Sequence, residues 1–314
     1  MKEYTISEND EGRRFDKYIM NILKNAPSSF TYKMLRKKNI VLNDKKASGT
    51  ETLRTGDNVK IYLSDETFEK FSKRDVGDHS LINLMPPVVY EDSDILIVNK
   101  PSGMLTQKSD PSDVSLNEIC LSYVCDSTDN DNVSDASFRP SVCNRLDRNT
   151  SGLVTFAKTY RAARNLSEAF RNRTIHKYYK CVVKGIISED MELTGTLIKD
   201  ETTNKVTVGS ADKNGSYIDT RIHPLYQGED LSYVEVMLIT GKTHQIRAHL
   251  AYAGHPILGD PKYGDRLLNE KYKKSHGIDS QMLVCYKLVI PDDFPISSIA
   301  GKTFSIDDDL MKVM

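Results

Sequence analysis

Short apolar runs separated by polar segments are the feature that most restricts the fold of this chain. Five runs have the length and the aliphatic content of buried strands: residues 95–98, 153–157, 181–183, 206–208 and 234–239. Few helical segments lie between them, and no regular βαβ alternation indicates a parallel sheet. The pattern therefore predicts an α+β protein with a mixed, mostly antiparallel sheet.

Length, charge and hydropathy restrict the class of protein further. The 314 residues are enough for one large domain and one small domain. The formal net charge is −1, so the overall charge does not indicate a nucleic-acid partner, and the distribution of charge matters more. There is no apolar run of about 18 residues and no signal-peptide pattern. We therefore expect a cytoplasmic protein without a membrane segment.

No metal or cofactor site is indicated by the sequence. The five cysteines are scattered and lack the paired spacing of zinc ligands, so we expect reduced, mostly buried thiols. His244 and His249 are five residues apart, which places them on different faces of a helix and excludes i, i+4 chelation. The sequence also lacks the glycine-rich motifs that bind dinucleotides or phosphates.

Residues 12–63 are predicted to form a small α/β domain. A first helix begins near residue 13, with apolar residues at i, i+4 and i+7. A second helix is predicted over residues 30–38, after a proline and two serines that can cap it. A short strand at residues 40–42 then meets Asn43-Asp44, which is typical of a hairpin turn.

The second helix and the hairpin carry concentrated positive charge. Residues 33–46 contain six basic side chains and one acidic side chain. Lys33, Arg36 and Lys37 fall on the outward face of the helix and are candidate RNA contacts. An ordinary solvated helix face is the alternative interpretation.

Two polar segments lie outside the predicted domains or at their surface. Residues 64–86 are charged, lack periodicity and end in a Pro-Pro pair, so they are predicted to form a linker. Residues 126–137 are rich in Asp, Asn and Ser and are predicted to form a surface loop. Residues 87–310 then form the large domain.

A helix is predicted over residues 160–172. Leu166 and Phe170 fall on one side at 100° per residue, and this apolar stripe is expected to pack on the sheet. Arg161 and Arg164 fall on the opposite side. They are either solvated surface or contacts to a phosphate backbone, and we treat both as candidate RNA contacts.

The segment from Asn144 to Gly152, NRLDRNTSG, carries a candidate nucleophile. It places Asp147 between Arg145 and Arg148, directly before a predicted strand. Nearby positive charge favours the ionised form of a carboxylate, and an ionised, oriented carboxylate can attack carbon. The same residues also suit a salt-bridged loop aspartate, so the two interpretations stay open at this point.

This segment resembles the H-R-L-D-x-x-T-S-G catalytic motif of the RluA family of pseudouridine synthases. Four more segments, in the same order, are similar to that family's motifs: 88–103, 177–185, 240–249 and 254–264. Together they cover roughly residues 87–264. Two positions depart from the family pattern, since Asn144 replaces a usual histidine and Lys242 a common arginine. Neither is the attacking group, so the departures concern substrate contacts.

The resemblance implies a role for each of five residues. Asp147 would be the nucleophile that attacks the target uridine, and Arg247 would pair with it. Tyr179 would stack on the flipped base or hold its hydroxyl near the proton that leaves carbon 5. Ile246 or Leu238 would form an apolar wall beside the base, and Arg145 would fill the space that the base leaves. Packing in the core is the alternative role of Tyr179 and Ile246.

The resemblance also implies a fold and a reaction. The catalytic domain would hold its active-site cleft in a split, mixed sheet, and the N-terminal domain is similar to the alpha-L RNA-binding motif. Isomerisation moves the glycosidic bond from nitrogen to carbon 5 of the same base and needs no cofactor. The residues do not decide whether Asp147 attacks carbon 6 or the anomeric carbon. A monomer is expected, because one chain supplies the whole site.

Large-subunit ribosomal RNA is the expected substrate, and transfer RNA is the alternative within the family. Two other classes of protein are alternatives to a synthase. A retaining glycosidase also uses an aspartate against an anomeric carbon, but it needs a second carboxylate as general acid. A non-catalytic RNA-binding protein of ribosome assembly would not need Asp147, Tyr179 and Arg247 together.

Overall fold

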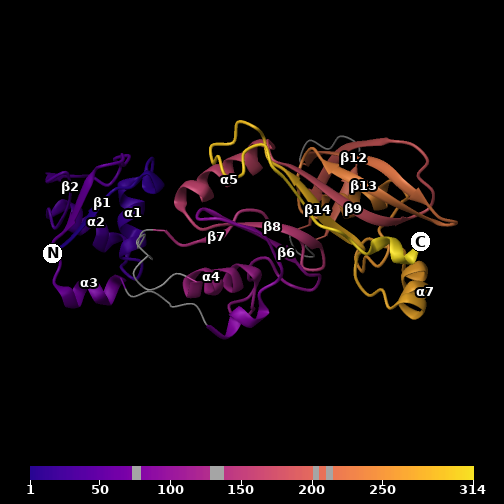
Figure 1. Ribbon diagram of the computed structural model, residues 1–314, viewed down its shortest axis with the longest axis horizontal. Coiled ribbons are helices and arrows are strands. Elements are labelled where there is room, and N and C mark those ends of the chain that lie inside the picture. Colours follow the sequence, from indigo (N-terminus) through magenta and orange to yellow (C-terminus); the bar gives the residue numbers. More distant parts are fainter. Residues whose placement is uncertain (73–78, 128–137, 201–204, 210–214) are drawn as a thin grey trace.

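The computed structural model describes residues 1–72, 79–127, 138–200, 205–209 and 215–314, and the statements below concern these residues. Two separate sheets organise the chain. Figure 1 shows a small N-terminal unit at one end and an elongated larger unit that holds the second sheet. None of the described helices has both the length and the apolar content needed to cross a membrane.

The small unit is a four-stranded antiparallel sheet covered by short helices. Its strands follow the order β1-β4-β2-β3. The elements are β1 (Lys2–Thr5), η1 (Glu8–Asp10), α1 (Phe15–Ile22), α2 (Ser28–Arg36), β2 (Ile40–Leu42), β3 (Lys45–Lys46) and β4 (Asn58–Ile61). Asn43 and Asp44 have φ angles of 51° and 59°, as a two-residue hairpin turn requires. The predicted hairpin is therefore confirmed.

The small unit extends beyond residues 12–63 at both ends. Strand β1 pairs with β4, so the sheet begins at Lys2. Residues predicted to form a linker instead form helix α3 (Asp65–Ser72). The ring of Phe71 lies 4.7 Å from that of Phe30. Phe68 and Phe71 thus hold this otherwise polar segment against the core of the small unit. Two apolar residues are too few to produce a recognisable helical periodicity in the sequence. Of the predicted linker, η2 (His79–Leu84) is also helical.

The large unit is built on one mixed sheet, in which β8 and β14 run parallel and the other pairs are antiparallel. The main order is β11-β10-β12-β13-β9-β14-β8-β6-β5, with β15 on β14 and β7 on β8. The bounds are β5 (Val88–Glu91), β6 (Ile95–Lys100), β7 (Ser141–Val142), β8 (Ser151–Ala157), β9 (His176–Lys184), β10 (Met191–Lys199), β11 (Val206–Gly209), β12 (Ser216–Gln227), β13 (Leu231–Leu238), β14 (Leu283–Val289) and β15 (Thr303–Ser305). The predicted α+β fold is confirmed.

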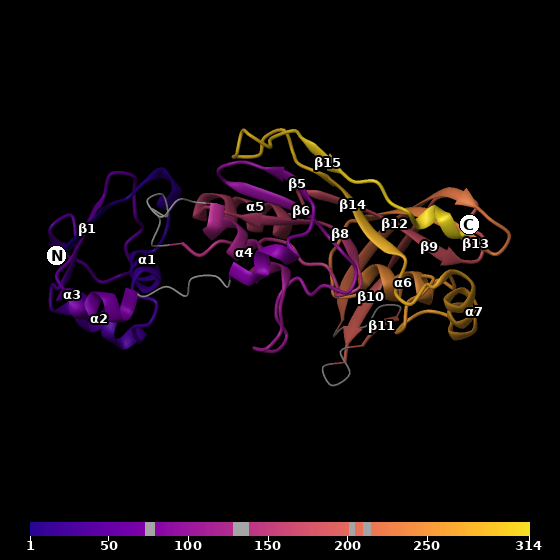
Figure 2. The same cartoon turned by 60° about the horizontal axis from the view of Figure 1, so that its bottom comes forward.

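Helices cover this sheet at both of its ends. Helices α4 (Leu116–Ser127) and α5 (Tyr160–Asn172) lie on opposite sides of the β5-β6-β8 end (Figure 1). Helices α6 (Gln245–Tyr252) and α7 (Arg266–His276) lie at the other end (Figure 2), and η3 (Leu310–Val313) closes the chain. Residues 128–137 of the predicted surface loop lie outside the described residues.

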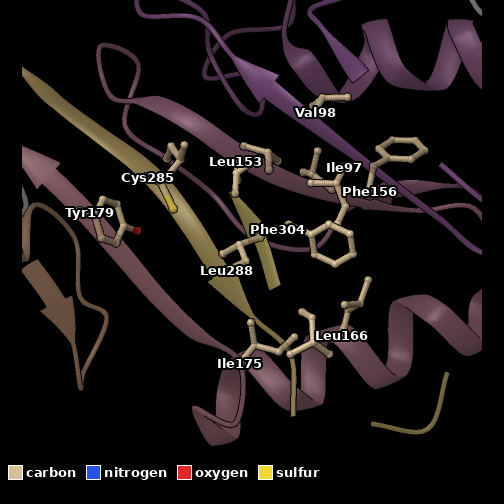
Figure 3. Packing of buried hydrophobic residues seen from close by; sticks show 14 of the residues in the cluster. Ile97, Val98, Leu153, Phe156, Leu166, Ile175, Tyr179, Cys285, Leu288 and Phe304 are labelled. Carbon is tan, nitrogen blue, oxygen red and sulfur yellow. The ribbon is translucent and has the colours of Figure 1, made fainter. Parts of the chain in front are cut away.

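The core forms where strands from distant parts of the sequence meet. Figure 3 shows Leu153 and Phe156 of β8 near Ile97 of β6, with Leu166 of α5 below them. On the other side of β8, Cys285 of β14 is fully buried. The cysteines are all free thiols, and three of the five are buried. This core holds the strands that the loops of the next section connect.

Gly152 is the residue at which β8 meets β14, and its replacement tests that contact. Its φ is +116°, and a Cβ there would lie 2.2 Å from the Cys285 carbonyl oxygen. We expect Gly152→Ala to lower the free energy of unfolding by about 3 kcal/mol or more, because strain and overlap add. Gly277, with φ +71° and no atom within 4 Å of its Cβ position, is the matched control and should lose only about 1–2 kcal/mol as Gly277→Ala. Equal losses in urea titrations would contradict this account.

Candidate active site

The loop that carries Asp147 joins β7 to β8 and is fastened to β8 by Asn144. The Asn144 Oδ1 accepts from the Thr155 amide at 2.7 Å and from the Thr155 hydroxyl at 2.9 Å. Its Nδ2 donates to the Leu153 carbonyl at 3.2 Å. Asn144 is thus buried and holds the loop in place, at the position where the related family usually has histidine.

A buried lysine fastens the same loop from the opposite side. Lys100 has no exposed surface, and its Nζ donates to the carbonyls of Pro101, Met104 and Arg148 at 2.9, 2.8 and 3.0 Å. Burial lowers the pKa of Lys100 to about 8, so it keeps three N–H donors at neutral pH. The only sequence feature that points to Lys100 is its place in the segment 88–103, which resembles a family motif.

Asp147 forms an ion pair with Arg247, which lies one hundred residues away on α6. The Arg247 Nη1 donates to the Asp147 Oδ2 at 2.8 Å. The Nε and Nη2 of the same guanidinium donate to Asp260 at 2.7 and 3.0 Å. The bidentate bond to Asp260 therefore fixes the plane of the guanidinium and directs Nη1 toward Asp147.

Asp260 is a functional candidate that the sequence did not single out. It is 1% exposed. Burial alone would raise the pKa of Asp260, but hydrogen bonds from Arg247 and from the amides of Lys262 and Tyr263 hold it below its ordinary value. Two carboxylates share Arg247 and keep the pKa of its guanidinium raised in spite of burial. The only sequence signal for Asp260 is its place in the fifth motif.

His244 lies on the other side of Asp147. Its Nε2 is 3.8 Å from the Asp147 Oδ2, and its Nδ1 lies 3.0 Å from the Tyr263 hydroxyl. Burial lowers the pKa of His244, although the charge of Asp147 opposes this shift. The imidazole is therefore neutral at neutral pH and adds a polar wall to the site without adding charge.

The two arginines beside Asp147 in sequence do not pair with it. Arg148 donates its Nε to the Gly103 carbonyl at 3.1 Å, and Arg145 is exposed at the rim of the pocket. The expectation that these neighbours provide the positive charge needs correction. Within the described residues, Asp147 pairs with Arg247 instead, and the charge of Lys100 also acts on it.

Asp147 lines a pocket of about 450 Å³, part of whose wall is apolar. Tyr179 and Ile246 line it and are 5% and 4% exposed. Figure 3 shows Tyr179 on β9 next to Cys285 on β14. Burial, and then the Cys285 thiol, raise the pKa of Tyr179 well above its usual value. The phenol therefore stays protonated, which suits a flat stacking surface or a hydrogen-bond donor.

Comparison with known proteins identifies the family of this chain. A family model described as RNA pseudouridylate synthase matches residues 94–252, about half of the chain. The chain belongs to this family. The synthase is 33% identical over 283 residues to "Ribosomal large subunit pseudouridine synthase C" of Vibrio parahaemolyticus, covering 88% of this chain and 84% of the relative. The protein of the same name in Vibrio vulnificus is 32% identical over 282 residues, with the same coverage.

A solved structure supports the fold of the synthase. Human RNA Pseudouridylate Synthase Domain Containing 4 matches with a TM-score of 0.58 and 20% identity, over 75% of this chain and 94% of that chain. At this identity the match concerns the fold alone. In the described part of the synthase, no group of three or more His, Cys, Asp and Glu side chains is arranged to hold a metal ion.

The five residues to which the resemblance gave roles at the target base come together in the synthase. Asp147, Arg145, Tyr179, Ile246 and Arg247 all line the one pocket. The segment 88–103, which had no predicted role, contributes Lys100 beneath the loop that carries Asp147. The residues that line this pocket therefore come from three of the five motifs, and Lys100 adds a contact from a fourth.

The five candidate RNA contacts of the synthase lie outside the pocket. Arg161 donates to Asp94 at 2.9 Å, and Arg164 donates to the Glu11 carbonyl of the small unit at 3.0 Å. Both arginines thus have partners within the chain, which the helical pattern could not reveal. Lys33, Arg36 and Lys37 are exposed on or beside α2. Contact of these five residues with RNA stays a prediction.

Proposed function

We propose that this synthase converts uridine to pseudouridine in large-subunit ribosomal RNA, with Asp147 as the nucleophile. The observation that carries the proposal is the Asp147–Arg247 ion pair at a pocket walled by Tyr179 and Ile246. The reaction breaks the bond from the anomeric carbon to nitrogen 1 and forms a bond from the anomeric carbon to carbon 5. The proton on carbon 5 is lost, and nitrogen 1 gains one, so no redox partner is consumed.

Each residue of the pocket has a part in this proposal. Asp147 forms a covalent bond to carbon 6 or to the anomeric carbon, and Arg247 aims it. The ring of Tyr179 stacks on the uracil, while Ile246 excludes water from the other side. Because this ion pair is already oriented before the reaction, it needs little rearrangement when charge moves during the reaction.

The target uridine must leave its stack to reach Asp147. Extrusion costs a few kcal/mol in a helix and less in a loop or bulge, so an irregular RNA region is the proposed target. Arg145, which is exposed and lines the pocket, would fill the space left by the base. Ribosomal RNA is favoured over transfer RNA because the two Vibrio relatives are named for the ribosomal large subunit.

Mapping of the product on two RNAs tests the substrate. Unmodified transcripts of large-subunit ribosomal RNA and of transfer RNA are incubated with the protein, digested and examined for pseudouridine by mass spectrometry. We expect pseudouridine at discrete positions of the ribosomal transcript. Product in transfer RNA alone would make that molecule the substrate, and product in neither would contradict the proposal.

The basic face of the small unit is proposed to add affinity through phosphate contacts. Replacement of Lys33, Arg36 and Lys37 by glutamate should weaken RNA binding at low salt and lower the slope of log Kd against log salt by about 2. Fluorescence anisotropy of a labelled ribosomal RNA fragment measures both. The matched control, Lys273→Glu with Lys274→Glu, changes exposed charges on α7 and should leave the slope unchanged. An unchanged slope in the first variant would remove α2 from the interface.

A further inference from the structure

Two cationic side chains converge on Gly241, between β13 and α6. Arg173 is the C-cap of α5, and Lys177 lies on β9. A Cβ on Gly241 would lie 2.6 Å from the Arg173 Nη1 and 3.6 Å from the Lys177 Nζ. Gly241 is not among the glycines with positive φ. Its lack of a side chain therefore serves the close approach of the two cations, rather than an unusual backbone conformation.

This cationic pair, Arg173 and Lys177, has no acidic partner among the residues that the structure describes. The Lys177 Nζ lies over the Phe170 ring, 5.8 Å from its centroid. Burial lowers the pKa of Lys177; the Cys285 thiol opposes this shift, and the charge of Arg173 adds to it. Two like charges held together without a counter-ion are unfavourable, so an anion that binds between them would relieve this repulsion.

The cationic pair lies within the pocket of Asp147. Both residues line it together with Tyr179. Lys177 and Tyr179 are alternate residues of one strand, so they point to the same face, with Cα atoms about 6.6 Å apart. The carboxylate among the lining residues belongs to Asp147, which already pairs with Arg247. A nucleotide whose base contacts Tyr179 would therefore bring its backbone within reach of the pair.

We propose that Arg173 and Lys177 bind a phosphate of the RNA backbone next to the target uridine. Uracil and ribose are neutral, and the phosphates are the anions that RNA offers. The inference rests on the proposed function and adds the group that anchors the reacting nucleotide. Arg173 supplies a planar fork for two phosphate oxygens, and Lys177 supplies a point charge.

Two charge-removing variants test the phosphate site by kinetics. Lys177→Met keeps the length of the side chain beside Phe170. Arg173→Gly suits the left-handed backbone at this position, where φ is 65°, so it does not strain the fold. For the large-subunit transcript, each variant should raise KM about tenfold and leave kcat within about twofold. The reason is that a phosphate away from the reacting atoms is bound equally in the ground state and in the transition state. The control Lys274→Met removes an exposed charge on α7 and should change neither constant.

Ethylation interference locates the phosphate itself. The transcript is treated with ethylnitrosourea, which neutralises single phosphates at random, and the RNA that each protein binds is sequenced. With the wild type, we expect ethylation of one phosphate beside the pseudouridine to prevent binding. With Lys177→Met, that phosphate should cease to matter while other interfering positions remain. Identical interference patterns for the two proteins would overturn the phosphate site.

The pseudouridine content of the same transcript separates this inference from the proposed function. A wild type that modifies the transcript but shares its interference pattern with Lys177→Met disproves the phosphate site alone. A wild type that forms no pseudouridine in the transcript disproves the proposed substrate, and the phosphate site falls with it. A fall in kcat at unchanged KM in both variants would also count against phosphate binding.

Discussion

Asp147→Asn is expected to abolish turnover while leaving RNA affinity nearly unchanged. The amide has the shape of the carboxylate but cannot form the bond to carbon, so kcat should fall by at least about 10⁴-fold. Arg247 keeps its two hydrogen bonds to Asp260, so the pocket retains its shape. Single-turnover rates at saturating enzyme measure the loss, and anisotropy with the same RNA measures the affinity.

The control for this variant is Asp309→Asn. Asp309 is exposed and pairs with Lys312 on the C-terminal turn, so the same change of charge there should leave both quantities unaltered. A single-turnover rate for Asp147→Asn within tenfold of the wild type would remove Asp147 from the role of nucleophile. A rate loss accompanied by an equal loss of affinity would instead indicate that Asp147 positions the RNA.

Arg247→Met is expected to destabilise the fold as well as to stop the reaction. It leaves Asp260, 1% exposed, without its bidentate partner, and it removes the ion pair of Asp147. Loss of one partner of a buried ion pair costs about 3–5 kcal/mol. Urea-induced unfolding of the wild type and the variant gives this difference, and the same samples should show no turnover.

The pH dependence of that difference follows from Asp260. In the wild type the pKa of Asp260 is held below its ordinary value of 3.8, so its contribution is present above that pH and is lost as pH falls through the lower folded value. In Arg247→Met burial dominates and the pKa of Asp260 rises above 3.8. The variant is then destabilised increasingly as pH rises from about 4 toward 7. The gap between the two proteins should therefore be largest at neutral pH.

Arg266→Met provides the matched comparison for Arg247→Met. Arg266 is 90% exposed and pairs with Glu270 one turn along α7, so its removal should change stability by less than about 0.5 kcal/mol at any pH. If Arg247→Met lost as little unfolding free energy as Arg266→Met, or if its loss grew toward acidic pH, Arg247 and Asp260 would not form a stabilising buried ion pair.

Local patterns predicted the elements of this fold well. Helix α5 runs from Tyr160 to Asn172, as its apolar stripe indicated, and the strand at 40–42 ends in the predicted turn. These features depend on neighbours within a few residues, which the sequence displays directly. Helix α3 was missed because two phenylalanines, packed on a surface formed by distant residues, hold an otherwise polar segment.

The site was predicted in part, and the missing part is tertiary. The pairing of Arg247 with Asp147 followed from the family resemblance and not from spacing. Asp260 orients Arg247 from 13 residues away in the sequence. Lys100 fastens the loop through a bond to Arg148, 48 residues away. The charge near Asp147 was assigned to its neighbours in the sequence. The folded loop turns them away, and only a three-dimensional arrangement reveals the true partner.

Release of tritium from large-subunit ribosomal RNA labelled at carbon 5 of uridine tests both the isomerase reaction and the role of Asp147 as its nucleophile. We expect the wild type to release one tritium for each pseudouridine formed and to release no free uracil. Asp147→Asn should release neither tritium nor uracil. Free uracil that retains its tritium would show hydrolysis of the glycosidic bond, and it would contradict the isomerase reaction. Tritium release by Asp147→Asn at the wild-type rate would contradict the proposed nucleophile.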